Sequence, residues 1–194
     1  MTREDIARSL VGLTAVLWFW SEAKWVIRQR ATSDRVVIKE SRSFFALVIS
    51  YGAAQMGAFG LMWFFPSLQI ADDWSTLMIA AMPLAWTGLA LRQWSVHTLG
   101  DFFRAKVTVQ RDHDVVRSGP YRYIRHPSYA GGLMTVMAMA LIFNHLAAWI
   151  VVVGAVFTGA LYRIRVEDEV LCRHLGSDYR HYAAHTSRLI PGIW

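Results

Sequence analysis

The chain has 194 residues, of which 55% are apolar and 13% aromatic, and its formal net charge is +6. This length suits one domain, and we expect residues 1–194 to form a single unit. The apolar content is high for a water-soluble protein. The single cysteine, Cys172, excludes an internal disulfide framework and is expected to be a packing residue.

The charged residues are strongly segregated along the chain. No Asp, Glu, Lys or Arg occurs in 43–71, 74–91 or 126–162. About twenty consecutive apolar residues in a helix cross the hydrocarbon core of a bilayer. These gaps therefore predict an all-α integral membrane protein.

Five membrane-spanning helices are predicted in chain order, at 6–26, 44–65, 74–91, 128–143 and 146–164. The first is the least apolar, because Glu22 and Lys24 lie near its end. The last charge-free gap is too long for one helix, and Asn144-His145 predicts a tight turn that divides it into a hairpin.

Basic residues set the expected orientation. They concentrate between residues 24 and 42 and between 92 and 125, whereas the second connection carries only Asp72 and Asp73. Basic loops stay on the cytoplasmic side. The N-terminus is therefore expected outside, and the C-terminus and the two basic connections, with any site built on them, inside; the net charge is interpreted as a topology signal and not as a nucleic-acid interface.

The third connection ends in a dense polar cluster at 119–131, which contains two arginines, a histidine and three tyrosines. Pro120 and Pro127 exclude a continuous helix through it. We expect a short strand at 106–110, an N-cap at Ser128, and close approach of a backbone or a ligand at Gly131-Gly132.

After the fifth span the sequence continues in a helical pattern with i,i+4 charge pairs, such as Arg163 with Glu167 and Glu169 with Arg173. Gly176 is predicted to end this helix, and 178–184 to form another. Composition alone favours a salt-bridged amphipathic tail on the membrane surface.

Several common sites are not indicated. The chain has no Gly-x-Gly-x-x-Gly after a strand and no Gly-x-Ser-x-Gly. His174, His181 and His185 have a spacing compatible with a metal, but we interpret them as a solvated helix face and expect no metal site.

An ordered set of motifs resembles the isoprenylcysteine carboxyl methyltransferase family and its phospholipid-methyltransferase relatives. The set comprises Leu99-Gly100, Val115-Val116, Gly119-x-Tyr121-x-x-x-Arg125-His126-Pro127-x-Tyr129, Glu167-Asp168, Leu175-Gly176-x-x-Tyr179-x-x-Tyr182 and Arg188-x-x-Pro191. The resemblance covers residues 88–194, the expected catalytic portion, whereas 1–87 carries mainly spans.

The resemblance implies an integral membrane enzyme that uses S-adenosylmethionine, in a pocket formed by the loop before the fourth span and the C-terminal helices. It implies cofactor contacts from Val116, Gly119, Tyr121, His126, Pro127, Tyr129 and Glu167, and catalytic roles for Arg125, Glu167 and Arg188, the two arginines lying nearer the substrate. Asp168 departs from the second glutamate common in the family, and its role is left open.

The chemistry agrees with a lipophilic carboxylate as the methyl acceptor. A carboxylate is already ionised near pH 7 and needs no general base, and an arginine can orient it in a bidentate manner. Phospholipid amines and thiols are alternative acceptors, and an NADPH-dependent sterol-type reductase or a non-enzymatic membrane subunit are alternatives outside the class. The expected partners are membrane lipids and a lipophilic or lipidated substrate, and no nucleic acid.

Overall fold

The computed structural model describes residues 1–31, 36–103, 107–110 and 114–192. Its five α-helices are α1 (Arg3–Ala31), α2 (Arg42–Phe64), α3 (Trp74–Leu99), α4 (Pro127–Met139) and α5 (Leu146–His185). Short 3-10 helices follow α3, precede α4 and follow α4, namely η2 (Gly100–Phe102), η3 (Gly119–Arg122) and η4 (Ala140–Phe143). The helical fold class and the five predicted helix positions are confirmed.

Within the described residues, three segments are long and apolar enough to cross a membrane: Arg42–Phe64, Trp74–Phe102 and Leu146–His185. The segment Pro127–Phe143, which contains α4 and η4, is apolar but shorter, and α1 does not meet the same criteria. These helices indicate an integral membrane protein. The count of five spans and the orientation of the termini stay predictions.

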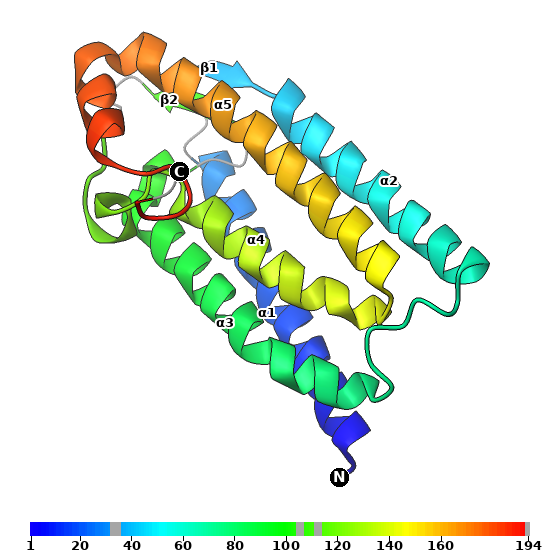
Figure 1. Cartoon of the computed structure of the whole chain (residues 1–194). Coiled ribbons are helices and arrows are strands. Elements are labelled where there is room, and N and C mark those ends of the chain that lie inside the picture. Colours follow the sequence, from blue (N-terminus) through cyan, green and yellow to red (C-terminus); the bar gives the residue numbers. More distant parts are fainter. Residues whose placement is uncertain (32–35, 104–106, 111–113, 193–194) are drawn as a thin grey trace.

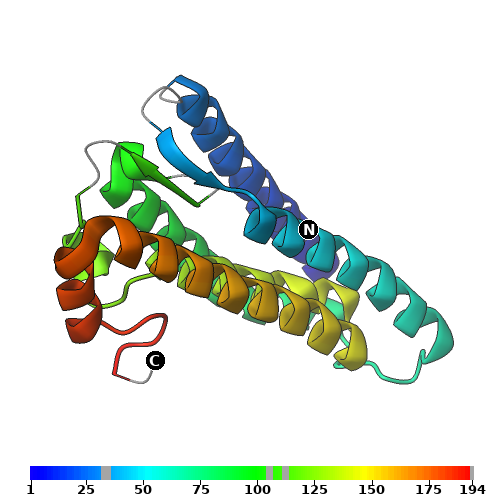
Figure 2. The ribbon, with the colours of Figure 1, turned by 90° about the horizontal axis from the view of Figure 1, so that it is seen from above.

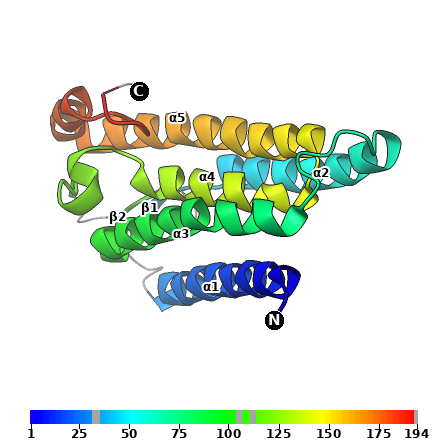
Figure 3. The ribbon, with the colours of Figure 1, turned by 60° about the horizontal axis from the view of Figure 1, so that its bottom comes forward.

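The helices pack as two groups that meet along α4 and α5 (Figure 1). In one group α3 packs against both α1 and α4, and in the other α2 packs against α5. Figure 3 shows α1 on the side of α3 that faces away from α5. Small and flexible apolar side chains fill the buried contacts in both groups, including Ala81, Ala85 and Met78 in the first and Ala54 and Ala148 in the second.

The contact between α3 and α4 depends on two glycines. A Cβ atom on Gly131 would lie only 2.5 Å from the carbonyl oxygen of Gly88 and 2.7 Å from the backbone nitrogen of Arg92. The close backbone approach predicted at Gly131 is thus confirmed. A Cβ on Gly132 would meet Arg92 and Trp18 at 3.9 Å, an ordinary contact distance.

A two-stranded antiparallel ribbon joins the first and third connections (Figure 2). It pairs β1 (Val36–Glu40) with β2 (Val107–Gln110). The strand predicted at 106–110 is confirmed for the described residues 107–110, and Lys106 lies outside them. The strand β1 is an addition to the predicted fold, because its short sequence was assigned only to a basic loop.

The start of α4 differs from the prediction. Pro127 is the first helical residue, so His126, not Ser128, holds the N-cap position, and it makes no side-chain cap. The Ser128 hydroxyl instead accepts a hydrogen bond from Nη1 of Arg92 at 2.8 Å. Between the two helices of the hairpin, Asn144 has a left-handed backbone with φ 45°, which confirms the predicted turn before α5.

The helix α5 continues well past the predicted span and bends sharply at Gly176, whose φ of 57° and ψ of −124° are not helical. The predicted break at Gly176 is confirmed, and the second segment extends to His185. The chain then turns back beside the residues before α4 (Figure 1): the backbone N–H groups of Arg125 and His126 donate to the carbonyls of Ser187 and Arg188 at 2.8 and 3.0 Å. The tail that follows α5, residues 186–192, therefore packs on the polar cluster at 119–131.

Candidate active site

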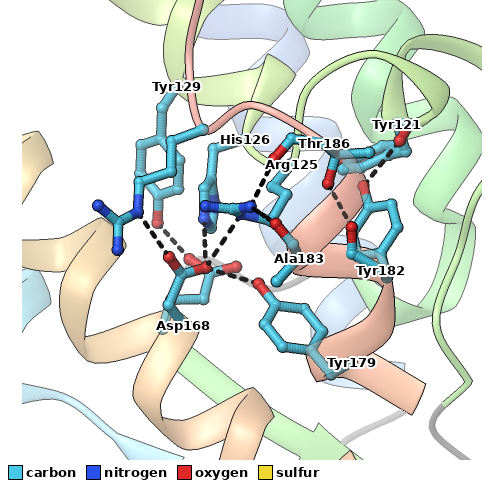
Figure 4. Close-up of polar contacts among 11 residues, drawn as sticks. Tyr121, Arg125, His126, Tyr129, Asp168, Tyr179, Tyr182, Ala183 and Thr186 are labelled. Atoms are coloured by element: carbon cyan, nitrogen blue, oxygen red, sulfur yellow. Dashed lines mark hydrogen bonds and ion pairs between the residues drawn. The ribbon is translucent and has the colours of Figure 1, made fainter. Parts of the chain in front are cut away.

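Asp168 lies at the centre of the polar cluster (Figure 4). Its Oδ1 accepts hydrogen bonds from Nε2 of His126 at 2.8 Å and from the Tyr179 hydroxyl at 2.6 Å. Its Oδ2 accepts from Nε of Arg188 at 3.0 Å, and Nε of Arg125 lies 3.9 Å from Oδ1. One carboxylate therefore connects the segment before α4, both halves of α5 and the tail.

Arg125 is nearly buried and reaches toward the C-terminal segment (Figure 4). Its Nη1 donates to the backbone carbonyls of Ala183 and Thr186. Its Nε is buried and has no hydrogen-bond partner among the described residues. This guanidinium therefore holds the C-terminal segment through Nη1, while its Nε–H makes no hydrogen bond among the described residues.

A second chain of hydrogen bonds passes through Tyr129 in the first turn of α4. Its hydroxyl donates to Oε2 of Glu167 at 2.7 Å and accepts from Nε of Arg163 at 2.6 Å. The guanidinium carbon of Arg163 lies 5.8 Å from the ring centre of Phe44 and 6.0 Å from that of Tyr129. The carboxylate of Glu167 is thereby held at a defined position on α5.

Tyr121 and Tyr182 close the cluster on the side of η3 (Figure 4). The Tyr182 hydroxyl donates to the carbonyl of Tyr121 at 2.7 Å. Burial, together with the negative charge of Glu167, raises the pKa of Tyr121 well above its usual value, so its phenol is neutral at physiological pH. Gly119 shapes the preceding turn: its φ is 56°, and a Cβ there would lie 2.9 Å from Oγ1 of Thr98.

Several of these groups, but not Asp168, border a cavity of about 280 Å³ between the two helix groups. Six of the predicted site residues line it, namely Val116, Tyr121, Arg125, His126, Tyr129 and Glu167. Toward the middle of the helices the wall becomes apolar and includes Leu47, Leu133, Val136, Val156 and Ala160. Val156 precedes Glu167 by eleven residues on α5, which corresponds to roughly 16 Å of helix, so the cavity is elongated from its polar end toward the apolar interior.

Three predicted site residues are not part of the cavity wall. Gly119 supports the turn before Tyr121, Pro127 is the buried first residue of α4, and Arg188 is bound to Asp168. The roles predicted for these residues stay predictions, and their positions indicate that they shape the site from behind its surface.

Neither the central position of Asp168 in the cluster nor the contribution of α1 and α2 was predicted from the sequence. Trp18, Glu22, Phe44 and Leu47 all line the cavity, although residues 1–87 were expected to carry mainly spans. The one available signal was Glu22 itself, since an ionisable residue within an apolar helix is a functional candidate.

The C-terminal histidines lie away from this cavity. The rings of His181 and His185 are 4.5 Å apart. No group of three His, Cys, Asp or Glu side chains suited to a metal ion occurs in the part of the chain that the structure describes.

Comparison with known proteins identifies relatives along most of the chain. Residues 80–173 match the model of the isoprenylcysteine carboxyl methyltransferase (ICMT) family. A protein-S-isoprenylcysteine O-methyltransferase from Dictyostelium discoideum is 28% identical over 189 residues, which are 95% of this chain and 76% of that protein. Protein-S-isoprenylcysteine O-methyltransferase B from Arabidopsis thaliana is 31% identical over 111 residues, 55% of each chain.

A solved structure is also similar. The eukaryotic intramembrane Ras methyltransferase ICMT superposes with a TM-score of 0.58 at 25% sequence identity, covering 81% of this chain and 55% of that one. The chain thus spans about half the length of this structure and of the Arabidopsis protein. The motifs, the family match and the shared membrane fold agree, and they identify the chain as a relative of the isoprenylcysteine carboxyl methyltransferase family of membrane methyltransferases.

Proposed function

We propose that the chain transfers a methyl group from S-adenosylmethionine to a lipophilic carboxylate at the boundary between membrane and cytoplasm. The observation that carries this proposal is the elongated cavity, which has Arg125, His126 and Glu167 at one end and aliphatic side chains at the other. Such a cavity suits the simultaneous binding of a polar cofactor and a lipophilic acceptor. The relatives named as protein-S-isoprenylcysteine O-methyltransferases support a prenylated cysteine as the acceptor class.

The residues present fit S-adenosylmethionine, which carries a sulfonium, an ammonium and a carboxylate. The Glu167 carboxylate and the aromatic rings of Tyr121 and Tyr129 suit the cationic groups. The buried Nε of Arg125, which lies 3.9 Å from Oδ1 of Asp168 and has no hydrogen bond among the described residues, suits a carboxylate. When bound, this cofactor supplies an electrophilic methyl group.

The protein's own contribution is alignment and exclusion of water. Tyr129 fixes Glu167 in one orientation, and the apolar wall excludes solvent from the reacting groups. A carboxylate acceptor needs no proton removed. We therefore propose positioning roles for Glu167 and Arg125 at the cavity, while Arg188 holds Asp168 and through it the orientation of His126.

The proposed topology follows from the basic connections. It places the N-terminus outside and the polar end of the cavity, with the C-terminus, on the cytoplasmic side. The water-soluble cofactor would then enter from the cytoplasm, and the acceptor from the membrane.

Calorimetry on the detergent-purified protein tests the cofactor. We expect S-adenosylmethionine and S-adenosylhomocysteine to bind at micromolar concentration, and NADPH not to bind. Absence of binding by both adenosyl ligands would contradict the proposal, and binding of NADPH alone would favour a reductase.

A labelled methyl-transfer assay tests the acceptor, with a prenylcysteine analogue, phosphatidylethanolamine and a small thiol compared side by side. We expect methylation of the prenylcysteine carboxylate. Arg125→Ala and Glu167→Ala should abolish transfer, whereas Glu169→Ala, which removes an exposed carboxylate on the same helix, should retain it. Full activity of both site variants would refute the assignment of these residues.

A further inference from the structure

We infer that Arg92 binds the carboxylate of the acceptor and that Glu22 and Ser128 hold its guanidinium in place for this purpose. The inference rests on the proposed methyl transfer and adds a residue that neither the motifs nor the resemblance assigned to the site. Arg92 lies on α3, and its side chain is 16% exposed and lines the cavity.

Two of the three nitrogens of this guanidinium are already fixed by neighbours from other helices. Nε donates to Oε1 of Glu22 on α1 at 2.7 Å. Nη1 donates to the hydroxyl of Ser128 on α4 at 2.8 Å and lies 3.4 Å from its carbonyl oxygen. These bonds set both the position and the plane of the group.

Aromatic rings hold the same cation. The guanidinium carbon lies 5.4 Å from the ring centre of Trp18 and 5.9 Å from that of Phe103. Nη2, in contrast, has no hydrogen-bond partner among the described residues. The cavity wall around Arg92 also includes Trp18, Glu22, Phe103 and Ser128. The residues that hold the guanidinium in place are thus part of the same wall as its remaining donor.

An arginine is well suited to bind each of the two ligand carboxylates. The amino-acid part of the cofactor carries one carboxylate, and the proposed acceptor carries the other. Among the residues that the structure describes, three arginines line the cavity: Arg92, Arg125 and Arg163. Arg163 donates to the Tyr129 hydroxyl that holds Glu167, and we assign the two carboxylates to Arg125 and Arg92.

The surroundings of these two arginines differ. Arg125 is bonded to Ala183 and Thr186, beside the C-terminal segment. Arg92 is enclosed by α1, α3 and α4 and lies next to the tryptophan ring of Trp18. A lipophilic acceptor approaching from the apolar part of the cavity would therefore meet Arg92, and a guanidinium on an aromatic face is well suited to orient its carboxylate.

The test compares two competing ligands that differ only in this group: N-acetyl-S-farnesylcysteine and its uncharged carboxamide. Loss of a charge-assisted hydrogen bond corresponds to roughly a 10- to 100-fold change in affinity. We expect the wild-type protein to prefer the acid by about this factor, and Arg92→Gln to lose the preference. The Kd for S-adenosylmethionine should stay within about threefold of the wild-type value, which a general packing defect would not allow.

Matched variants separate binding from folding. Arg173→Gln removes an exposed arginine that is paired with Glu169, and it should retain the preference for the acid. Glu22→Gln keeps the charge of Arg92 but weakens its support, and it should raise KM for the acid more than it lowers kcat. If Arg92→Gln does not fold, Arg92→Lys decides the question, because the point charge should keep only part of the preference.

An undiminished preference in Arg92→Gln or Arg92→Lys, or equal binding of acid and carboxamide by the wild-type protein, overturns the inference. A parallel loss of cofactor affinity in both Arg92 variants would do the same, since it would indicate a structural role. Failure of the wild-type protein to bind S-adenosylmethionine or to transfer methyl groups would instead defeat the proposed function.

Discussion

His126 is bound to the C-terminal part of the chain twice. Its Nε2 lies 2.8 Å from Oδ1 of Asp168, and its backbone N–H donates to the carbonyl of Arg188 at 3.0 Å. Both contacts involve α5 or the tail that follows it, so the polar end of the cavity exists only when this segment is docked. Asp168 connects the docking of the tail to the shape of the site.

Asp168→Asn is expected to weaken both docking and cofactor binding. The amide keeps the size of the side chain but removes the charge that faces His126 and Arg188. Loss of hydrogen bonds between charged groups corresponds to about 2 to 3 kcal/mol of stability, or roughly 5–10 °C in the midpoint of thermal unfolding in detergent. Calorimetry should show weaker binding of S-adenosylmethionine.

Glu169→Gln serves as the control, because Glu169 is the adjacent residue, is largely exposed and pairs only with Arg173 among the residues described. It should change the midpoint little. If the two variants behave alike, Asp168 does not organise the site.

Tyr129→Phe is expected to lower activity while the fold is retained. It removes the hydroxyl between Glu167 and Arg163 and leaves the ring in place. We expect kcat to fall by about 10- to 100-fold, since one link of a charged hydrogen-bond chain is lost. Tyr123→Phe, at a tyrosine that is 61% exposed, should have wild-type kinetics in the same methyl-transfer assay. Equal rates for both variants would show that the Tyr129 hydroxyl plays no part.

Local signals in the sequence predicted the helical framework well. Charge-free runs located α2 to α5, and Asn144 and Gly176 marked the turn and the kink, because each conformation depends on a few adjacent residues. The motif resemblance likewise identified six residues of the cavity wall.

Long-range pairs were not predictable in this way. Glu22 and Arg92 are 70 residues apart and His126 and Asp168 are 42 apart, and nothing in either local pattern specifies its partner. The strand β1 was missed for the same reason, because a five-residue segment becomes a strand here only by pairing with β2, which is distant in the sequence. Helix packing and tail docking create these contacts.

The cap of α3 should make stability depend on pH. The Asp73 carboxylate accepts from the Ser75 and Thr76 hydroxyls at 2.5 and 2.6 Å and from their backbone N–H groups at 3.0 and 3.3 Å. These bonds lower its pKa from an ordinary value of 3.8 to about 2. The stabilisation is therefore complete above about pH 4 and is lost as the pH falls toward 2.

Thermal unfolding of Asp73→Ala measures this contribution. Its midpoint should lie below that of the wild-type protein at pH 6, and the difference should narrow at pH 2.5. Asp72→Ala, at the exposed neighbour, should match the wild type at both values. A difference for Asp73→Ala that is independent of pH would show that the carboxylate charge is not what stabilises the helix start.

The backbone contact between α3 and α4 should tolerate Gly132→Ala but not Gly131→Ala. At Gly131 a methyl group would overlap the Gly88 carbonyl at 2.5 Å and the Arg92 nitrogen at 2.7 Å, both of them backbone atoms that cannot rotate away. We expect a loss of about 1 to 3 kcal/mol, seen as a lower unfolding midpoint. At Gly132 the nearest side-chain atoms lie 3.9 Å from the new methyl group, and the higher helix propensity of alanine should leave stability unchanged or raise it.

Because Gly131 also touches the backbone of Arg92, separation of the helices in Gly131→Ala should weaken binding of the prenylcysteine acid more than binding of its carboxamide. If Gly131→Ala is as stable as Gly132→Ala, α3 and α4 do not approach each other as closely as the contact between Gly88 and Gly131 requires.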